Sequence, residues 1–133
     1  MSDLTIPIFV VKEDEVAIQT FYQNGKNYIH FIFKDKFTYD SSVTATEAWK
    51  EYCDKSPGKN FVHIWDCQNM QGFDKKAKDL WMEYMDSYIG QTEKIILVSD
   101  NILIRGAARI MSKFTKHNLS IYKTFSEMKE AEL

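Results

Sequence analysis

Asp66 and Asp100 are the residues of this chain whose positions point most directly to chemistry. Each ends an apolar run, at 61–66 and 95–100, and each precedes a segment with helical spacing. Two neighbouring carboxylates can bind Mg²⁺ or share a proton, so this pair is a candidate site. We favour the other interpretation, in which both cap helices, because a hard cation needs more than two oxygen ligands and the spacing marks no others. No metal is therefore expected.

Other reactive side chains do not form a recognisable catalytic set. Cys67 directly follows Asp66, where a reactive thiol could act, but no base is identifiable. His30 and His63 lie in strand patterns and His117 ends a helix, and no spacing joins them. The chain has no Gly-rich phosphate loop, GxSxG elbow or HExxH helix. We expect a protein without a cofactor that is not an enzyme, with a hydrolase or thiol-dependent activity as the alternative.

The segment 102–116 predicts a helix with a basic side. This side holds Arg105, Arg109, Ser112, Lys113 and Lys116, opposite the apolar Leu103, Ala107, Ile110 and Phe114. It is either a solvated surface or a contact for an acidic partner or anionic head groups, since arginine can bind carboxylate or phosphate with two hydrogen bonds. Gly106, Ala107 and Ala108 favour close packing of this helix.

Aromatic residues are concentrated on two predicted helices. Trp49 lies on the first, and Trp81, Tyr84 and Tyr88 share one side of the second. They form either an aromatic-rich core or an apolar pocket or dimer surface, because aromatic residues are also enriched at interfaces.

Length and composition indicate one domain. At 133 residues the chain is long enough for a core of its own. The net charge of −2 gives no basic field for nucleic acid. Two cysteines without a CxxC pair indicate reduced thiols, and the first residues have neither a basic region nor a long apolar segment, so we expect a cytoplasmic protein.

The pattern along the chain predicts a hairpin followed by alternating helices and strands. Residues 5–11 are β-rich but contain Pro7, which favours an edge strand or an extended lead-in. Alternating runs on both sides of Asn24-Gly25 predict the hairpin. The helices are expected at 42–55, with a Thr44/Glu47 capping box, at 73–89, ended by Gly90, at 102–116, with Asn118 as its stop, and after a capping Ser126; the last strand is expected at 119–125.

These elements predict an α/β fold in which a mixed sheet has an N-terminal antiparallel hairpin and then parallel strands. Runs that are apolar at nearly every position are typical of strands covered on both faces. Asp66 and Asp100 should then lie at the carboxyl edge of the sheet, where open α/β sheets bind ligands and partners. Asp100 is expected to cap the helix that carries Arg105 and Arg109.

From about Val16 to its end the chain resembles the STAS or SpoIIAA-like group, whose fold is related to the Sec14 lipid-binding domain. The resemblance rests on the order of elements and on local similarity in 99–109, at Phe114 and in 125–131. It implies a single bacterial domain that regulates other proteins. In the anti-sigma-factor antagonists of this group, a partner kinase phosphorylates a serine in an Asp-Ser-Ser-Gly-like turn.

The matching turn here, 66–72, contains no serine or threonine. Phosphorylation acts by adding charge to a hydroxyl, so the resemblance implies an interaction module without that switch. We expect another protein to bind at Asp66, Cys67, Gln68, Asn69, Asp100, Asn101, Arg105 and Arg109. The alternative is a Sec14-like carrier of a lipid or small apolar ligand, with Trp49, Trp81 and Tyr84 lining its cavity. A homodimer is also compatible with the sequence.

Overall fold

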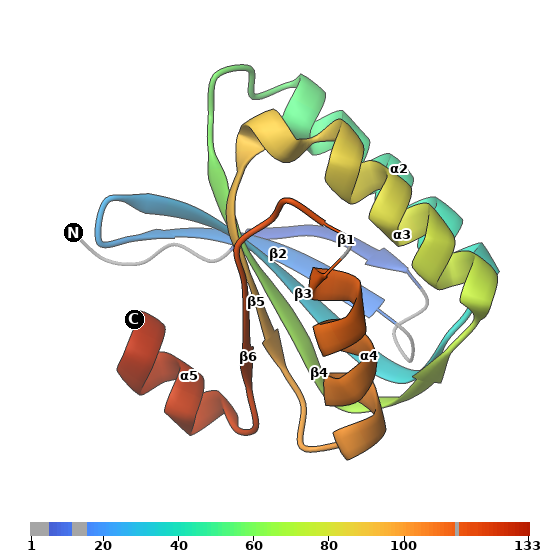
Figure 1. Cartoon of the computed structure of the whole chain (residues 1–133). Helices are drawn as coiled ribbons and strands as arrows, with labels where there is room; N and C mark the ends of the chain where they lie inside the picture. The colour runs from blue at the N-terminus through green and yellow to red at the C-terminus, as the bar shows by residue number, and fades with distance from the viewer. Residues whose placement is uncertain (1–5, 12–15, 114) are drawn as a thin grey trace.

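One mixed sheet runs through the protein (Figure 1). The computed structural model describes residues 6–11, 16–113 and 115–133. Its sheet has six strands in sequence order: β1 (Ile6–Val11), β2 (Val16–Gln23), β3 (Lys26–Phe37), β4 (Phe61–Phe73), β5 (Thr92–Val98) and β6 (Leu119–Tyr122). The pairs β1–β2 and β2–β3 are antiparallel and the other pairs are parallel, which confirms the expected fold class.

The N-terminal strands follow the local sequence. Asn24 and Gly25 turn the hairpin with positive φ angles of 53° and 79°, the geometry that an Asn-Gly turn provides. Pro7 pairs with Gln19 on the outermost strand, and a bulge follows it. The predicted edge strand is therefore part of the sheet, at the position where a residue without an N–H group is tolerated.

Helices cover the two faces of the sheet unequally. Figure 1 shows α2 (Tyr39–Asp54), α3 (Lys75–Ser87) and α4 (Ile102–Ser112) on one side, and α5 (Phe125–Glu132) on the other. Side chains of β4 alternate between them: Trp65 packs in the larger core, and Ile64 packs in the smaller one with Met128 of α5. Because both faces are covered, the central strands are apolar at nearly every position.

An aromatic cluster forms the centre of the larger core. Trp49 and Trp81 are buried, with 2% and 5% of their surface exposed, and their ring centroids lie 5.1 Å apart. Trp81 also meets the edges of Phe31 at 5.1 Å and Phe37 at 5.4 Å. Edge-to-face pairs at such distances stabilise the packing beyond the area they bury.

Two helices begin at residues other than those predicted. The end of the preceding strand determines which residue caps each helix. The Thr38 side chain, directly after β3, accepts a hydrogen bond from the Ser41 amide and starts α2. Thr44 lies inside the helix, where its hydroxyl donates to the Asp40 carbonyl, so the expected capping box is wrong. Thr124 starts α5 by accepting from the Glu127 amide, in place of Ser126.

The largest correction concerns 66–72, which is strand and not a turn. These residues continue β4 beside the end of β3, with Asn69 opposite Lys34 and Met70 opposite Asp35, after a shift of register. The long strand β3 supplies hydrogen-bonding partners that the local sequence does not reveal. The strand β4 therefore continues beyond Asp66.

Several predicted helix and strand ends are also shifted. Asp74 precedes α3, which stops at Tyr88, while Gly90 lies in the 3₁₀ turn η1 (Ile89–Gln91) and is not the cap. Lys113 ends α4 before 116, and β6 ends at Tyr122. Phe114, predicted to pack in this helix, lies outside the described residues. None of the described helices is long and apolar enough to cross a membrane.

Candidate functional site

Asp66 lies in β4 on the face covered by α5. Its Oδ1 accepts hydrogen bonds from the backbone N of Gln68 at 3.2 Å and from Nε2 of the same residue at 2.9 Å. Its Oδ2 lies 3.6 Å from Nε2 of His30, a distance too long for an ordinary hydrogen bond but short enough for an ionic contact. Partial burial opposes the charge of Asp66, whereas His30 and Gln68 favour it and lower the pKa of this carboxyl overall.

Cys67 points to the opposite face of the sheet and belongs to the larger core. Burial, with a smaller contribution from the nearby Asp66 charge, raises the pKa of its thiol far above the usual range. Because the thiolate is the nucleophile, Cys67 is poorly suited to the reactive role considered from its position. Gln68 and Asn69 are exposed on β4 beyond it.

Asp100 is exposed and does not cap α4. Asn101 does so instead, since its side chain accepts a 2.9 Å hydrogen bond from the Leu103 amide. Asp66 pairs in register with Val98, so both aspartates lie at the same end of the sheet as expected. Asn101 is the better cap because it stands immediately before the first helical residue.

Arg105 is tied to the loop that precedes its own helix. Its Nη1 donates a 3.0 Å hydrogen bond to the carbonyl of Ser99, a fully buried residue. The Ser99 Oγ in turn accepts from the Asn101 amide at 3.1 Å. Arg105 therefore holds the start of α4 in place, whereas Arg109 is exposed.

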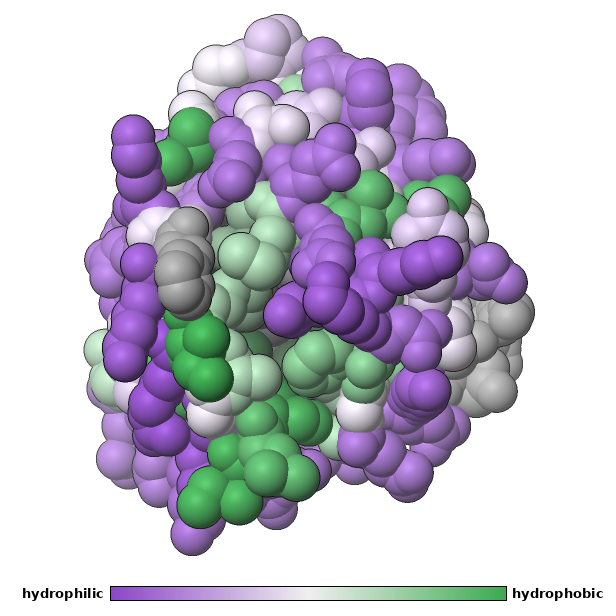
Figure 2. All heavy atoms as spheres, turned by 45° about the vertical axis from the view of Figure 1, so that its right-hand side comes forward, coloured by the Kyte–Doolittle hydropathy of each residue, from purple (hydrophilic) through white to green (hydrophobic). Residues whose placement is uncertain are grey.

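The α4 helix turns large apolar side chains to solvent. Ile102, Leu103 and Ile110 are 70%, 80% and 61% exposed, and the buried residues of the helix are Ile104 and Ala108. The predicted inward face, which contained Leu103 and Ile110, is therefore wrong. Figure 2 shows apolar side chains gathered at the bottom of the view. We call Ile102, Leu103 and Ile110 the α4 patch.

A small apolar cavity opens beside the α4 patch, between α3, α4 and the sheet. Its volume is about 70 Å³. It is lined by Phe33, Phe37, Trp65, Cys67, Met70, Phe73, Lys78, Trp81, Leu97, Ile104, Ala107, Ala108 and Met111. Lys78 is the one charged residue among them, and Figure 2 shows the hollow with apolar side chains at its walls.

The predicted aromatic set is divided by the structure. Trp81 lines the cavity, but Trp49, Tyr84 and Tyr88 do not. The two tyrosines are half-buried and pack against Trp49, with ring centroids 6.1 and 6.2 Å away. The Tyr88 hydroxyl donates to Asp54 at 3.2 Å, so this tyrosine joins α3 to α2.

His30 lies on the opposite face of the sheet from His63 and His117. His63 is fully buried in the larger core, where desolvation, with a smaller effect of His117, lowers its pKa to about 3. His117 lies 2.8 Å from the Met85 carbonyl through its Nε2, whereas His30 lies on the α5 side. Among the residues that the structure describes, no three His, Cys, Asp or Glu side chains gather as metal ligands do.

No protein-family model and no curated protein matches the sequence. Among solved structures, the chain is similar to an uncharacterised Shewanella loihica protein of the DUF3478 family with a SpoIIAA-like fold. The TM-score is 0.73 at 14% identity, and the match covers 100% of this chain and 98% of the other.

Two proteins described as anti-sigma factor antagonists are also similar in structure. Unphosphorylated SpoIIAA, an anti-sigma factor antagonist, has a TM-score of 0.59 at 9% identity, covering 86% of this chain and 96% of its own. A candidate anti-sigma factor antagonist from Thermotoga maritima has a TM-score of 0.56 at 11% identity, covering 78% and 86%. The chain therefore has a SpoIIAA-like fold, and this confirms the fold that the resemblance in its sequence implies.

Proposed function

We propose that this protein is a non-enzymatic STAS-type regulatory module that binds another protein through the α4 patch. The observation that carries the proposal is the exposure of Ile102, Leu103 and Ile110 on one short helix. Burying a large aliphatic side chain contributes about 1.5–3 kcal/mol, and grouped exposed apolar residues mark interaction sites. The fold supports the class of function, since two of its structural neighbours are described as anti-sigma factor antagonists.

Binding in this proposal does not depend on a phosphorylated turn. The segment 66–72 has no hydroxyl side chain, and it forms a strand in which Asp66 already bonds to Gln68. A partner would therefore bind the protein without any phosphorylation of the segment 66–72. The carboxyl end of β5 lies near five polar residues that, in this proposal, border the bound partner. They are Asp66, Gln68 and Asn69 of β4, and Asp100 and Asn101 after β5.

The chemistry near Asp66 supports a binding role over an enzymatic one. Burial raises the pKa of both thiols, that of Cys53 to about 11, so neither is activated as a nucleophile. Asp66 and Cys67 face opposite sides of β4, so they do not act on a common substrate. We propose a cytoplasmic location, which suits two free cysteines.

A Sec14-like carrier is the second candidate, because the cavity beside α4 is lined almost entirely by apolar residues. Its volume of about 70 Å³ is well below the roughly 300 Å³ at which ligand pockets usually begin. A space of this size suits one side chain better than a lipid. Native mass spectrometry tests the point: we expect the mass of the chain alone, and a co-purifying lipid would favour the carrier.

Self-association is a competing use of the same apolar residues. A homodimer through the α4 patch would bury Leu103 and Ile110 of both chains. Sedimentation velocity at several concentrations separates the two uses, and we expect a monomer that leaves the patch free.

The direct test of the proposal is partner binding by two matched variants. Leu103→Asp/Ile110→Asp changes the α4 patch, and Tyr39→Asp/Ile89→Asp changes two residues that are 42% exposed elsewhere. Proteins captured from the encoding organism are identified, purified and titrated against both variants. We expect the first variant to lose binding by at least about tenfold and the control to keep it. Equal losses, or no direct binder, would contradict the proposal.

A further inference from the structure

Charge is distributed very unevenly along the chain. From Asn101 to Ser126 there are five basic residues and no acidic ones, in a protein of net charge −2. The basic residues are Arg105, Arg109, Lys113, Lys116 and Lys123. Arg105 and Arg109 belong to α4 and Lys113 is its C-cap, so three of the five cations lie on the helix that carries the α4 patch.

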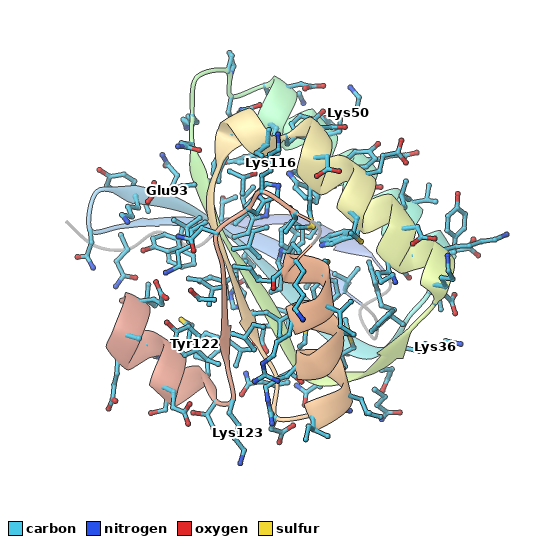
Figure 3. All side chains as sticks on the ribbon, in the orientation of Figure 1. Lys36, Lys50, Glu93, Lys116, Tyr122 and Lys123 are labelled. Carbon is cyan, nitrogen blue, oxygen red and sulfur yellow. The ribbon has the colours of Figure 1, made fainter. Side chains whose placement is uncertain are left out.

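These cations are not neutralised within the described part of the chain. Lysines on other elements are paired, such as Lys36 with Asp74 at 3.0 Å and Lys94 with Glu132 at 2.7 Å. Among the described residues, no carboxylate lies within 4.0 Å of the side-chain nitrogens of Arg109, Lys113, Lys116 or Lys123, and all four are exposed. Figure 3 shows Lys116 beyond the end of α4 and Lys123 at the opposite end, beyond β6.

The apolar surface of α4 is continuous with the cavity. Leu103, Ala107 and Ile110 recur at helical spacing, so they are neighbours along the helix. The outer two are exposed and Ala107 lines the cavity. Arg109 and Lys113 follow on the outer side of Ile110, and Lys78 of α3 lines the cavity itself. The result is an apolar strip and a cavity sized for a side chain, with cations on both sides.

We propose that the occupant of this surface is an acidic amphipathic helix of the partner protein, which inserts one large apolar side chain into the cavity. This inference rests on the proposed function and adds the chemistry of the partner. Acidic residues of such a helix would meet Lys78, Arg109 and Lys113, and its apolar side would cover Leu103 and Ile110. Complementary charges at an interface direct association and exclude unsuitable partners. The cavity favours a protein side chain over the acyl chains of a membrane lipid because of its size.

The test uses a displayed library of random peptides about 15 residues long, near the length at which helices begin to form in water. Binders are selected on the full chain and titrated against three variants. Arg109→Glu/Lys113→Glu reverses two charges at the α4 patch, and Lys59→Glu/Lys76→Glu makes the same change in net charge on exposed lysines elsewhere. Ala107→Leu fills the mouth of the cavity without changing a charge. Thermal melting checks that all three fold.

We expect the selected peptides to be acidic with a large apolar residue on one side. Their affinity should fall by at least about tenfold for Arg109→Glu/Lys113→Glu and for Ala107→Leu, and remain within about twofold for the control. Neutral or basic peptides, equal binding to all variants, or no enrichment would overturn the inference. So would tighter binding to phosphatidylglycerol vesicles than to any peptide. If identified partners bind through the α4 patch without acidic helices, the proposed function stands and this inference fails.

Discussion

His63 is a polar side chain enclosed by aromatic rings. Its ring lies 5.6 Å from that of Phe31 and 4.9 Å from that of Trp49, measured between centroids. Among the described residues, neither ring nitrogen has a hydrogen-bond partner. Desolvation lowers the pKa of His63 to about 3, so the folded protein holds it neutral.

The pH dependence of stability follows from this shift. The unfolded chain takes up a proton at His63 near its ordinary pKa of 6.5, and the folded chain does so only near 3. This difference costs no stability well above pH 6.5, and between pH 6.5 and pH 3 the free energy of unfolding falls as the pH falls, by up to about 1.4 kcal/mol per pH unit.

The variant His63→Phe should remove this dependence. Phenylalanine fits an aromatic site and leaves no unpaired polar atom, so we expect a free energy of unfolding at pH 7 that is higher by about 1 kcal/mol. Urea unfolding at pH 7 and pH 5 measures both effects. A variant less stable than the wild type at both pH values would show that the imidazole makes an interaction that phenylalanine does not replace.

The cysteines give a second prediction at the scale of single residues. Burial raises the pKa of Cys53 to about 11 and that of Cys67 further. Both should resist iodoacetamide at pH 8 in the folded protein and react fully in guanidinium, as read by mass spectrometry. Rapid modification of Cys67 in the folded protein would support the alternative of a thiol-dependent enzyme activity.

At the scale of elements, α5 depends on one buried side chain and one polar cluster. Met128 is completely buried against the sheet, beside Val62 and Ile64. At the end of the helix, Glu132 accepts a hydrogen bond from the Tyr122 hydroxyl and pairs with Lys94 at 2.7 Å. These contacts attach α5 to β5 and β6.

The variant Met128→Ala should loosen this helix. Removing a buried methionine side chain costs about 2–5 kcal/mol. Hydrogen exchange is expected to rise in α5 and in the facing part of β4. Met82→Ala, on the half-buried side of α3, is the matched control and should leave α5 protected. Unchanged exchange in α5 would mean that the polar cluster alone holds it.

The sequence predicts the order and type of the elements, because the strand patterns and the Asn-Gly turn are local signals. It does not predict which residue caps each helix. Near Thr38, Asn101 and Thr124 a neighbouring polar residue could also act as the cap, and the position at which the preceding strand ends determines which one does. Nor does it predict the length of β4, whose continuation depends on β3. The choice of cap and the length of β4 both depend on tertiary contacts.

The face of α4 shows most clearly where the sequence falls short. Leu103, Ala107 and Ile110 have helical spacing, but so do Ile104, Ala108 and Met111. Only the packing against the sheet and α3 determines that Ile104 and Ala108 are buried and Met111 is partly buried, while Leu103 and Ile110 are exposed. One signal was present in the sequence: Ile102, Leu103 and Ile104 are consecutive, and three consecutive residues cannot all face one side of a helix.

At the scale of the whole molecule, apolar exposure and positive charge coincide on one side. The aromatic core is shielded by α2 and α3. The α4 helix presents Leu103 and Ile110 to solvent, beside cations that form no salt bridge with another described residue. If a charged partner binds here, its association rate should fall as salt rises, because screening shortens the reach of these charges to about 8 Å at physiological ionic strength.

The central claim is that the α4 patch contacts a protein, and site-directed photocrosslinking tests it most directly. A benzophenone amino acid replaces Ile110 in one version of the protein and Tyr39, an exposed residue on α2, in another. Both are expressed in the encoding organism and irradiated. We predict a distinct protein adduct from position 110 and none from position 39. Equal adducts from both positions, a lipid adduct, or no adduct from position 110 would contradict the account.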